Sequence, residues 1–213
     1  MKFDKGIDKK YRKSVEDAFA TIIAKGNEEH RHVMNEIEES DLLIRVQPVS
    51  EINASGITGV INSIKTNYKL ATERMSLREA LGDIYIAIAE ETIDTGGQRG
   101  CEGTFVHEGR HAYDFAQTIE TLSNKDVNPI GIFNPTLYEL ELAAHKTSGD
   151  YMLCVNKGEY LDEGLGLRIL CREGEGPCTV SDDGINQRLR DSYGLAIDAN
   201  QGATASEMMG IVV

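Results

Sequence analysis

The chain has 213 residues, 40% of them apolar, and a formal net charge of −13. This length suits one domain with a hydrophobic core, and the lack of tryptophan beside five Phe and eight Tyr predicts that the core is aliphatic. An acidic surface repels phosphate backbones and anionic lipid, so nucleic-acid and membrane partners are not expected.

The N-terminus has no feature of a secretory signal. Its first seventeen residues are highly charged and lack the apolar stretch that such signals contain. The chain has no run approaching the roughly 18 apolar residues that span a bilayer. The sequence therefore predicts a cytoplasmic protein, or one exported without a conventional signal peptide.

The four cysteines are Cys101, Cys154, Cys171 and Cys178. They are too few to define a disulfide scaffold in a chain of this length, and none forms the CxxC pair of a zinc ribbon. Free thiols are therefore favoured. Cys171 and Cys178 bracket a Gly-rich turn and would form a bridge in an oxidising environment.

Two helices and a strand are predicted at the start of the chain. Apolar residues recur at helical spacing from residue 8, and Gly26-Asn27 is expected to end this first helix. A second helix is predicted over 30–39. The apolar run at 42–49 predicts a strand, and Pro48 near its end is typical of an edge strand or a strand terminus.

The next segments lead to a second strand. Residues 53–67 are predicted to form a loop or short hairpin, and 72–81 a short helix or a loop with a helical turn. Within 83–94, three Ile residues alternate with other side chains at the period of a strand. The Gly-rich residues 95–100 lack the GK[ST] ending of phosphate loops, so we expect a flexible lead-in to the following helix.

Two longer helices follow. The first is expected from Thr104, as N-cap or first-turn residue, to about Leu122. The second is expected from Pro135, capped by Asn134, to between residues 152 and 155.

The C-terminal part of the chain is Gly-rich and acidic. A hairpin is predicted around 167–180, and a short helix at 185–193. Helices, two strands, two longer helices and this tail together predict a mixed α+β domain.

The first of the longer helices contains His107-Glu108-Gly109-Arg110-His111. Residues four apart lie one turn apart on one helix face, so His107 and His111 point the same way, at a spacing that lets two imidazoles share one zinc ion. Glu108 lies next to that face, where it can take a proton from a zinc-bound water. The motif therefore predicts a zinc centre that hydrolyses an amide bond.

A catalytic zinc needs a third protein ligand. The second longer helix offers Glu141 and His145, which share a face with Tyr138. Glu139 points elsewhere, so only one of the two acids is expected to face the metal. Glu141 is the favoured ligand, and the choice between Glu139 and Glu141 stays open from the sequence alone.

Other candidates for the third ligand fit less well. Asp114 is only three residues beyond His111, too near for easy convergence, and it is better suited to orient an imidazole as a hydrogen-bond acceptor. The residue ten positions after His107 is Gln117, so the metzincin pattern HExxHxxGxxH is not met.

This arrangement, HExxH followed about 30 residues later by a helical Glu, resembles the gluzincin group of zinc metallopeptidases. The resemblance covers residues 84–152. It implies that His107, His111 and Glu141 bind zinc and that Glu108 is the general base. In several such families the ligand Glu opens the motif E-x-x-A-D, whose Asp hydrogen-bonds a ligand imidazole. Here the motif is E-L-A-A-H, so His145 would either take that role or bind the metal.

The sequence HExxH-A-Y-D with a later Y-E-x-E is also similar to small metallopeptidases among bacterial effectors and toxins. The resemblance implies a zincin-like α+β fold, with a small mixed sheet packed on the metal-binding helix and on the helix carrying the third ligand. We expect one domain over 1–213, with a core at 84–155, a helix-and-strand part at 1–80 and a Gly-rich extension at 156–213. The strand at 84–88 is expected either to lie along the cleft, with a free edge for a peptide, or to be a plain core strand.

Several reactive side chains lie outside the motif. His30 and His32 are expected to be solvated on a charged helix. A thiolate at Cys101, six residues before His107, would be able to cap the zinc, but a bystander thiol is favoured. Four tyrosines are candidates to donate a hydrogen bond to the oxyanion, and the sequence does not choose among Tyr138, Tyr151, Tyr160 and Tyr193.

Three functions are compatible with these residues. The favoured one is a zinc-dependent peptidase or amidase that acts on a peptide or protein. The second is a catalytically silent zincin-fold protein that binds a partner through the cleft, which the presence of Glu108 argues against. The third is a helix-rich structural module without metal.

Overall fold

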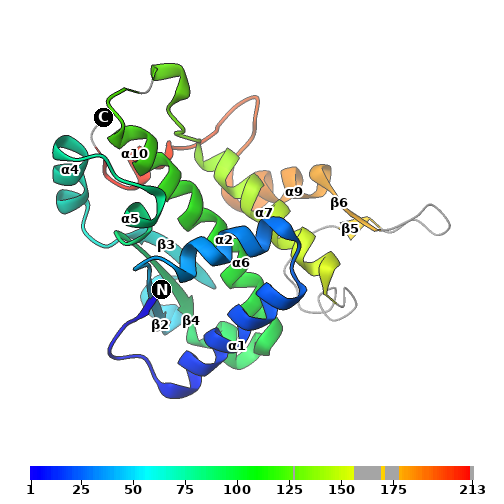
Figure 1. The fold of residues 1–213 in the computed structure, drawn as a ribbon. Coiled ribbons are helices and arrows are strands. Elements are labelled where there is room, and N and C mark those ends of the chain that lie inside the picture. Colours follow the sequence, from blue (N-terminus) through cyan, green and yellow to red (C-terminus); the bar gives the residue numbers. More distant parts are fainter. Residues whose placement is uncertain (127, 156–168, 171–177, 212–213) are drawn as a thin grey trace.

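A small four-stranded sheet lies beside a long central helix in the computed structural model, which describes residues 1–126, 128–155, 169–170 and 178–211 (Figure 1). The strand order is β1-β2-β4-β3. Strands β1, β2 and β4 are parallel, whereas β3 runs antiparallel to β4. The strands span Lys2–Phe3 (β1), Leu43–Gln47 (β2), Gly56–Val60 (β3) and Ile84–Ala89 (β4). This mixed sheet with many helices confirms the predicted α+β class.

Helices make up most of the rest of the described chain. They are α1 (Lys9–Lys25), α2 (Glu28–Glu38), α3 (Val49–Ile52), α4 (Ser63–Thr72), α5 (Leu77–Leu81), α6 (Glu90–Ser123), the 3₁₀ turn η1 (Pro129–Gly131), α7 (Leu137–Cys154), α9 (Asp182–Arg188), the π-helical turn η2 (Leu189–Tyr193) and α10 (Ala205–Met208). None of the helices that the structure describes is both long and apolar enough to cross a lipid bilayer.

The hydrophobic core is mainly aliphatic, as predicted. Strand β4 lies between β2 and β3, and it contributes Ile84, Ile86 and Ile88, none of which is exposed. A strand covered on both faces needs apolar residues on both, which explains its nearly continuous apolar sequence. Helix α6 begins directly after this strand and contacts α1, α5 and α7 (Figure 1). The motif helix is therefore anchored in the centre of the molecule.

Helix α6 starts much earlier than the sequence predicts. It begins at Glu90, so Thr104 is a buried residue inside the helix and not its N-cap. The predicted flexible lead-in is reduced to one non-helical residue, Gly97, with φ 59° and ψ −154°. Glycine adopts this positive φ without the steric penalty that a side chain brings, so the chain kinks there and continues as helix.

Helix α7 begins at Leu137, two residues later than predicted. Thr136 caps it by a reciprocal pair of bonds, in which the Thr136 side chain accepts from the backbone N–H of Glu139 and Glu139 accepts from the backbone N–H of Thr136. The predicted cap, Asn134, instead exchanges two hydrogen bonds with Ser206, each 2.9 Å long. Tertiary contact with the C-terminal segment therefore moves the start of the helix.

The first half of the chain confirms three predictions and corrects a fourth. The break at Gly26-Asn27 separates α1 from α2, and β2 ends just before Pro48. The segment 53–67 is neither a loop nor a local hairpin, because it contains β3, which pairs with the distant β4, and the start of α4. Residues 72–81 contain the short helix α5.

The C-terminal part contains the predicted hairpin, in which β5 (Ile169–Leu170) pairs antiparallel with β6 (Thr179–Val180). Its turn and Cys171 lie outside the described residues. Cys178 is disulfide-bonded, so the prediction of a free thiol is wrong at this position, whereas Cys101 and Cys154 are free. The predicted helix at 185–193 is present as α9 followed by η2, and the sequence did not predict α10.

His30 is buried, which contradicts the expected solvation, whereas His32 is exposed as predicted. The His30 Nδ1 atom accepts from the backbone N–H of Asn27 at 3.0 Å, and its Nε2 atom lies 2.8 Å from the carbonyl oxygen of Thr147. The neutral ring therefore joins the start of α2 to α7. Burial lowers the pKa of His30 below its ordinary value, and the bond to Thr147 opposes that shift only in part.

We expect the stability that His30 contributes to disappear in acid. A buried neutral histidine binds its proton more readily in the unfolded chain, so the free energy of unfolding falls as the pH drops below about 6.5. Between pH 8 and pH 5.5 this group accounts for at most about 1.4 kcal/mol. In urea unfolding at the two pH values, His30→Gln should show a smaller pH effect than the wild type. The exposed control His32→Gln should keep the wild-type effect; equal pH effects in all three proteins would contradict the assignment.

Candidate metal centre

Three ligand-type side chains converge where α6 packs against α7. His107 and His111 come from successive turns of α6, and Glu141 faces them from α7. The two histidine Nε2 atoms are 3.1 Å apart. Each lies 3.5 Å from an oxygen of Glu141, which is Oε2 for His107 and Oε1 for His111. These residues form a group that could hold a metal ion.

The spacing within this group agrees with tetrahedral coordination. Two atoms that each lie about 2.0–2.1 Å from a tetrahedral zinc ion are separated by about 3.3 Å. The observed separations of 3.1 and 3.5 Å fall on either side of that value. Two imidazole nitrogens with one carboxylate oxygen form a donor set typical of a catalytic zinc. The residues therefore fit the metal that the sequence motif predicts.

Two buried polar atoms next to the centre have no hydrogen-bond partner among the described residues. They are Oε2 of Glu141 and Nε2 of His145. Buried polar groups are almost always satisfied, and an unpaired buried carboxylate oxygen is costly. A divalent cation held by the two imidazoles and Glu141 would compensate the carboxylate.

The charges within the group favour an ionised carboxylate. Burial alone would raise the pKa of Glu141, but the imidazoles of His107 and His111 outweigh it and hold that pKa well below the usual range. Burial would likewise lower the pKa of His111, but Glu141 and Glu108 reverse the shift and raise it. An ionised Glu141 would thus neutralise part of the charge of a dication held between these side chains.

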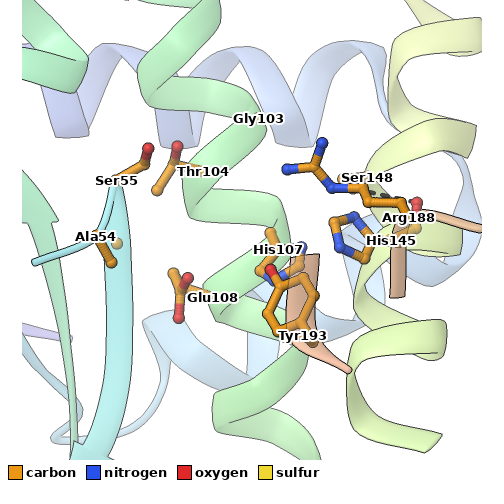
Figure 2. Close-up of a pocket in the computed structure, with 11 residues that line it drawn as sticks. Ala54, Ser55, Gly103, Thr104, His107, Glu108, His145, Ser148, Arg188 and Tyr193 are labelled. Carbon is orange, nitrogen blue, oxygen red and sulfur yellow. Dashed lines mark hydrogen bonds between the residues drawn. The ribbon is translucent and has the colours of Figure 1, made fainter. Parts of the chain in front are cut away.

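Glu108 lies beside the group but is not one of its members. Its Oε2 atom accepts a 2.8 Å hydrogen bond from the hydroxyl of Thr58 on β3. Strand β3 comes this close because residue 56 is glycine: a Cβ atom there would lie 2.6 Å from Thr104 Cγ2 and 2.8 Å from Glu108 Cγ. The strand therefore holds the Glu108 carboxylate at the wall of the adjoining cavity (Figure 2).

The structure decides between the two acids of α7. Glu139 is engaged at the helix N-terminus, where its Oε2 accepts from Thr136. Glu141 is the acid that joins His107 and His111 in the group that could hold a metal ion, as favoured from the sequence. Tyr138, predicted on the same face, is buried and bonded to Asn186 at 2.6 Å.

Two secondary roles predicted from the sequence find no support in the contacts. Asp114 is buried, but both of its oxygens accept from Nε of Arg110 at 3.0 Å, and it has no hydrogen bond to an imidazole among the described residues. His145 lies outside the three-residue group: its Nε2 atom is 3.7 Å from Glu141 Oε2 and its ring centroid is 4.8 Å from that of His107. Burial and the neighbouring His107 lower the pKa of His145 to about 3, so its ring is neutral.

Two cavities flank the site. One, of about 290 Å³, is lined by polar and small side chains that include Ser55, Thr104, Ser148 and Arg188 (Figure 2). The other, of about 270 Å³, is more apolar and is lined in part by Ile57, Phe115, Leu137 and Met208. His107, Glu108 and Tyr193 line both, so the two cavities form the two sides of one cleft.

The edge strand of this cleft is β3 and not the predicted strand. Strand β4 is paired on both edges, with β2 and β3, which supports the plain-core alternative for 84–88. Strand β3 has only one neighbour in the sheet that the structure describes, and it runs along the cleft. Its other edge therefore has no partner strand in the described part of the chain.

The tyrosine candidates separate clearly. Tyr138 and Tyr151 are buried, and Tyr151 donates to Glu102 at 2.9 Å. Tyr160 lies outside the described residues. Tyr193 lines the cleft together with His107, and its ring centroid lies 6.2 Å from that of His145 (Figure 2). Burial raises its pKa to about 12, so its hydroxyl keeps the proton needed to donate a hydrogen bond.

Cys101 does not reach the centre. It is completely buried, and its thiol contacts the carbonyl oxygen of Ser14 at 3.8 Å. Burial raises the pKa of this thiol to about 12, which confirms the bystander interpretation over a thiolate that caps a metal.

Sequence reasoning missed Thr58 and Arg188, because both lie far from the motif in segments without a recognisable pattern.

Comparison with known proteins yields no match, whether with family models, with curated proteins or with solved structures. The chemistry of the site therefore rests on its own geometry. Its elements are two histidines and a glutamate at metal-ligand spacing, a separate carboxylate, and an open cleft.

We expect Glu141→Gln to weaken binding of zinc by at least about tenfold, because the amide replaces the ionised ligand. The matched control is Glu139→Gln. It makes the same change two residues earlier on α7 but leaves His107, His111 and Glu141 in place. Elemental analysis after dialysis of tag-free protein measures the bound metal. Equal zinc content in the two variants would contradict the assignment of Glu141.

Proposed function

We propose that this chain is a zinc-dependent peptidase with a zincin-like arrangement of sheet and helices, and that the metal is held by His107, His111 and Glu141. The observation that carries the proposal is the convergence of these three side chains at 3.1 to 3.5 Å. Beside them lies a fourth side chain, Glu108, whose carboxylate is held separately by Thr58. A site that only binds metal has no need of that extra carboxylate.

Zinc, when bound, supplies Lewis acidity that polarises a carbonyl group and acidifies water. The chain itself supplies the proton transfer. Glu108 is positioned over the cavity with one carboxylate oxygen bonded to Thr58. We assign it as the general base that takes a proton from the attacking water and then passes it to the nitrogen of the leaving amine. The bond from Thr58 fixes the carboxylate in place for both transfers.

Tyr193 is the tyrosine that we assign to the oxyanion. As the amide carbon becomes tetrahedral, negative charge develops on its oxygen, and a fixed donor at that position lowers the barrier. Tyr193 alone among the three described candidates lines the cleft, on both of its sides. Its hydroxyl is protonated at neutral pH.

The shape of the site favours an extended peptide as the substrate. Strand β3 offers an edge along the cleft, and a peptide in extended conformation can add to such an edge by main-chain hydrogen bonds. The cavities on the two sides of Glu108 would then receive side chains from the two sides of the scissile bond. A catalytically silent binding protein is the alternative, and the buried, hydrogen-bonded Glu108 favours the enzyme.

The decisive variant is Glu108→Gln, which keeps the size of the side chain but removes the base. We expect this protein to bind as much zinc as the wild type and to lose about 10²–10⁴-fold in kcat on any peptide that the wild type cleaves. Metal content and cleavage of a peptide mixture are measured on the same preparation. Undiminished cleavage by the variant would overturn the mechanism, and a zinc-loaded wild type that cleaves nothing would support the silent alternative.

A second variant, Tyr193→Phe, tests the oxyanion donor. Loss of one such donor typically lowers kcat by about 10²-fold or somewhat more, with little change in KM because the bond forms in the transition state. Tyr138→Phe is the control, since its hydroxyl is bonded to Asn186 away from the cleft. A fall in kcat of similar size in both variants would indicate a structural effect instead.

A further inference from the structure

Arg188 brings a guanidinium group into the polar side of the cleft. It is the last residue of α9, and its side chain reaches across the cavity toward α6, near His145 and Ser148 (Figure 2). The residue is half-buried, and its Nε atom is fully shielded from solvent. That atom has no hydrogen-bond partner in the described part of the chain.

The acids that line the cleft do not neutralise Arg188. Glu108 is bonded to Thr58, and Glu141 faces the imidazoles of His107 and His111. Across the residues that the structure describes, no carboxylate forms an ion pair with the Arg188 guanidinium. The chain has 35 acidic and only 22 basic residues, so most basic side chains are expected to have an acidic partner. Arg188 has none among the described residues, although it lies inside a cleft.

Such an arrangement is costly unless a ligand completes it. A shielded guanidinium donor loses its hydration, and the loss is recovered only when an acceptor arrives. The planar fork of arginine matches a carboxylate in a bidentate manner, and charge-assisted bonds of this kind are about twice as strong as neutral ones. The unpaired donor in this cavity is therefore suited to an anionic group of the substrate.

We propose that Arg188 determines specificity by binding a carboxylate of the peptide substrate on the polar side of the cleft. This inference rests on the proposed peptidase function and adds the class of substrate. The carboxylate comes either from the C-terminus of the peptide or from an Asp or Glu side chain. On the other side of Glu108, the cavity lined by Ile57, Phe115 and Leu137 accepts an apolar side chain. The favoured substrate thus combines an acidic group with an apolar residue across the scissile bond.

Arg190 provides a matched control for this proposal. It lies two residues further on, in η2, and is exposed and absent from the cleft lining. Arg188→Gln and Arg190→Gln therefore remove the same charge from the same segment, but only the first removes the donor from the cavity. Both variants are loaded with zinc and compared with the wild type.

The test uses a proteome-derived peptide mixture in its native form and after conversion of all carboxyl groups to amides, with cleavage sites mapped by mass spectrometry. We expect the wild type and Arg190→Gln to cut native peptides at a fixed distance from a carboxylate and to cut the amidated mixture at least about tenfold less. Arg188→Gln should lose that discrimination. Cuts at a constant offset from Asp or Glu identify a side chain, and cuts at a constant distance from the peptide end identify the C-terminus. Equal discrimination by wild type and Arg188→Gln would overturn the proposal.

A binding measurement separates this inference from the proposed function. Titration calorimetry with benzoylglycine and with its amide is carried out on the zinc-loaded Glu108→Gln protein, with and without the Arg188→Gln change. We expect the acid to bind at least about tenfold more weakly when Arg188 is replaced, and the amide to be little affected. If the wild type cleaves no peptide but this difference is found, the peptidase function is refuted and the carboxylate-binding role of Arg188 is supported. If peptides are cleaved but Arg188→Gln changes the binding of the acid and of the amide alike, the role of Arg188 is refuted and the peptidase function is supported.

Discussion

The rest of the site depends on one interaction, in which a buried carboxylate lies between two imidazole rings. Glu141 reaches this position only because α7 packs along α6, and one of its oxygens is left without a hydrogen bond among the described residues. Burying a charge in this way costs several kcal/mol unless an opposite charge compensates it. The imidazoles of His107 and His111 share the carboxylate, and a dication between the three groups would complete the balance of charge.

Two glutamates near each other acquire different properties from their surroundings. Glu141 is directed at the histidines, whereas Glu108, the residue after His107, accepts a hydrogen bond from the hydroxyl of Thr58. This separation depends on Gly56, since any larger residue at that point would press on Thr104 and on Glu108 itself. In the proposed mechanism, a backbone feature of an edge strand thus keeps one acid available for proton transfer while the other is directed at the metal-binding histidines.

Local patterns sufficed to predict the parts of the structure that local physics controls. The helical spacing in HExxH put His107 and His111 on one face, and the alternation of Ile residues gave β4 correctly. The start of α7 and the identity of the edge strand were missed, because they depend on Asn134 pairing with Ser206 and on β3 pairing with β4 across the chain. His30 was expected in solvent, since a charged helix gives no local sign that α7 covers one of its residues. For the same reason, no pattern could have placed Arg188 in the cleft.

The division of the metal-type ligands between two helices has a thermodynamic consequence. His111 and Glu141 are 30 residues apart in the sequence, so an ion held between them acts as a clip that closes this stretch of chain. An ion that binds only the native state, at a thousand times its dissociation constant, adds about 4 kcal/mol to the free energy of unfolding. That amount is comparable to much of the net stability of an ordinary domain. In the proposed zinc peptidase, the supply of zinc would then govern both how much of the protein is active and how long each molecule survives proteolysis.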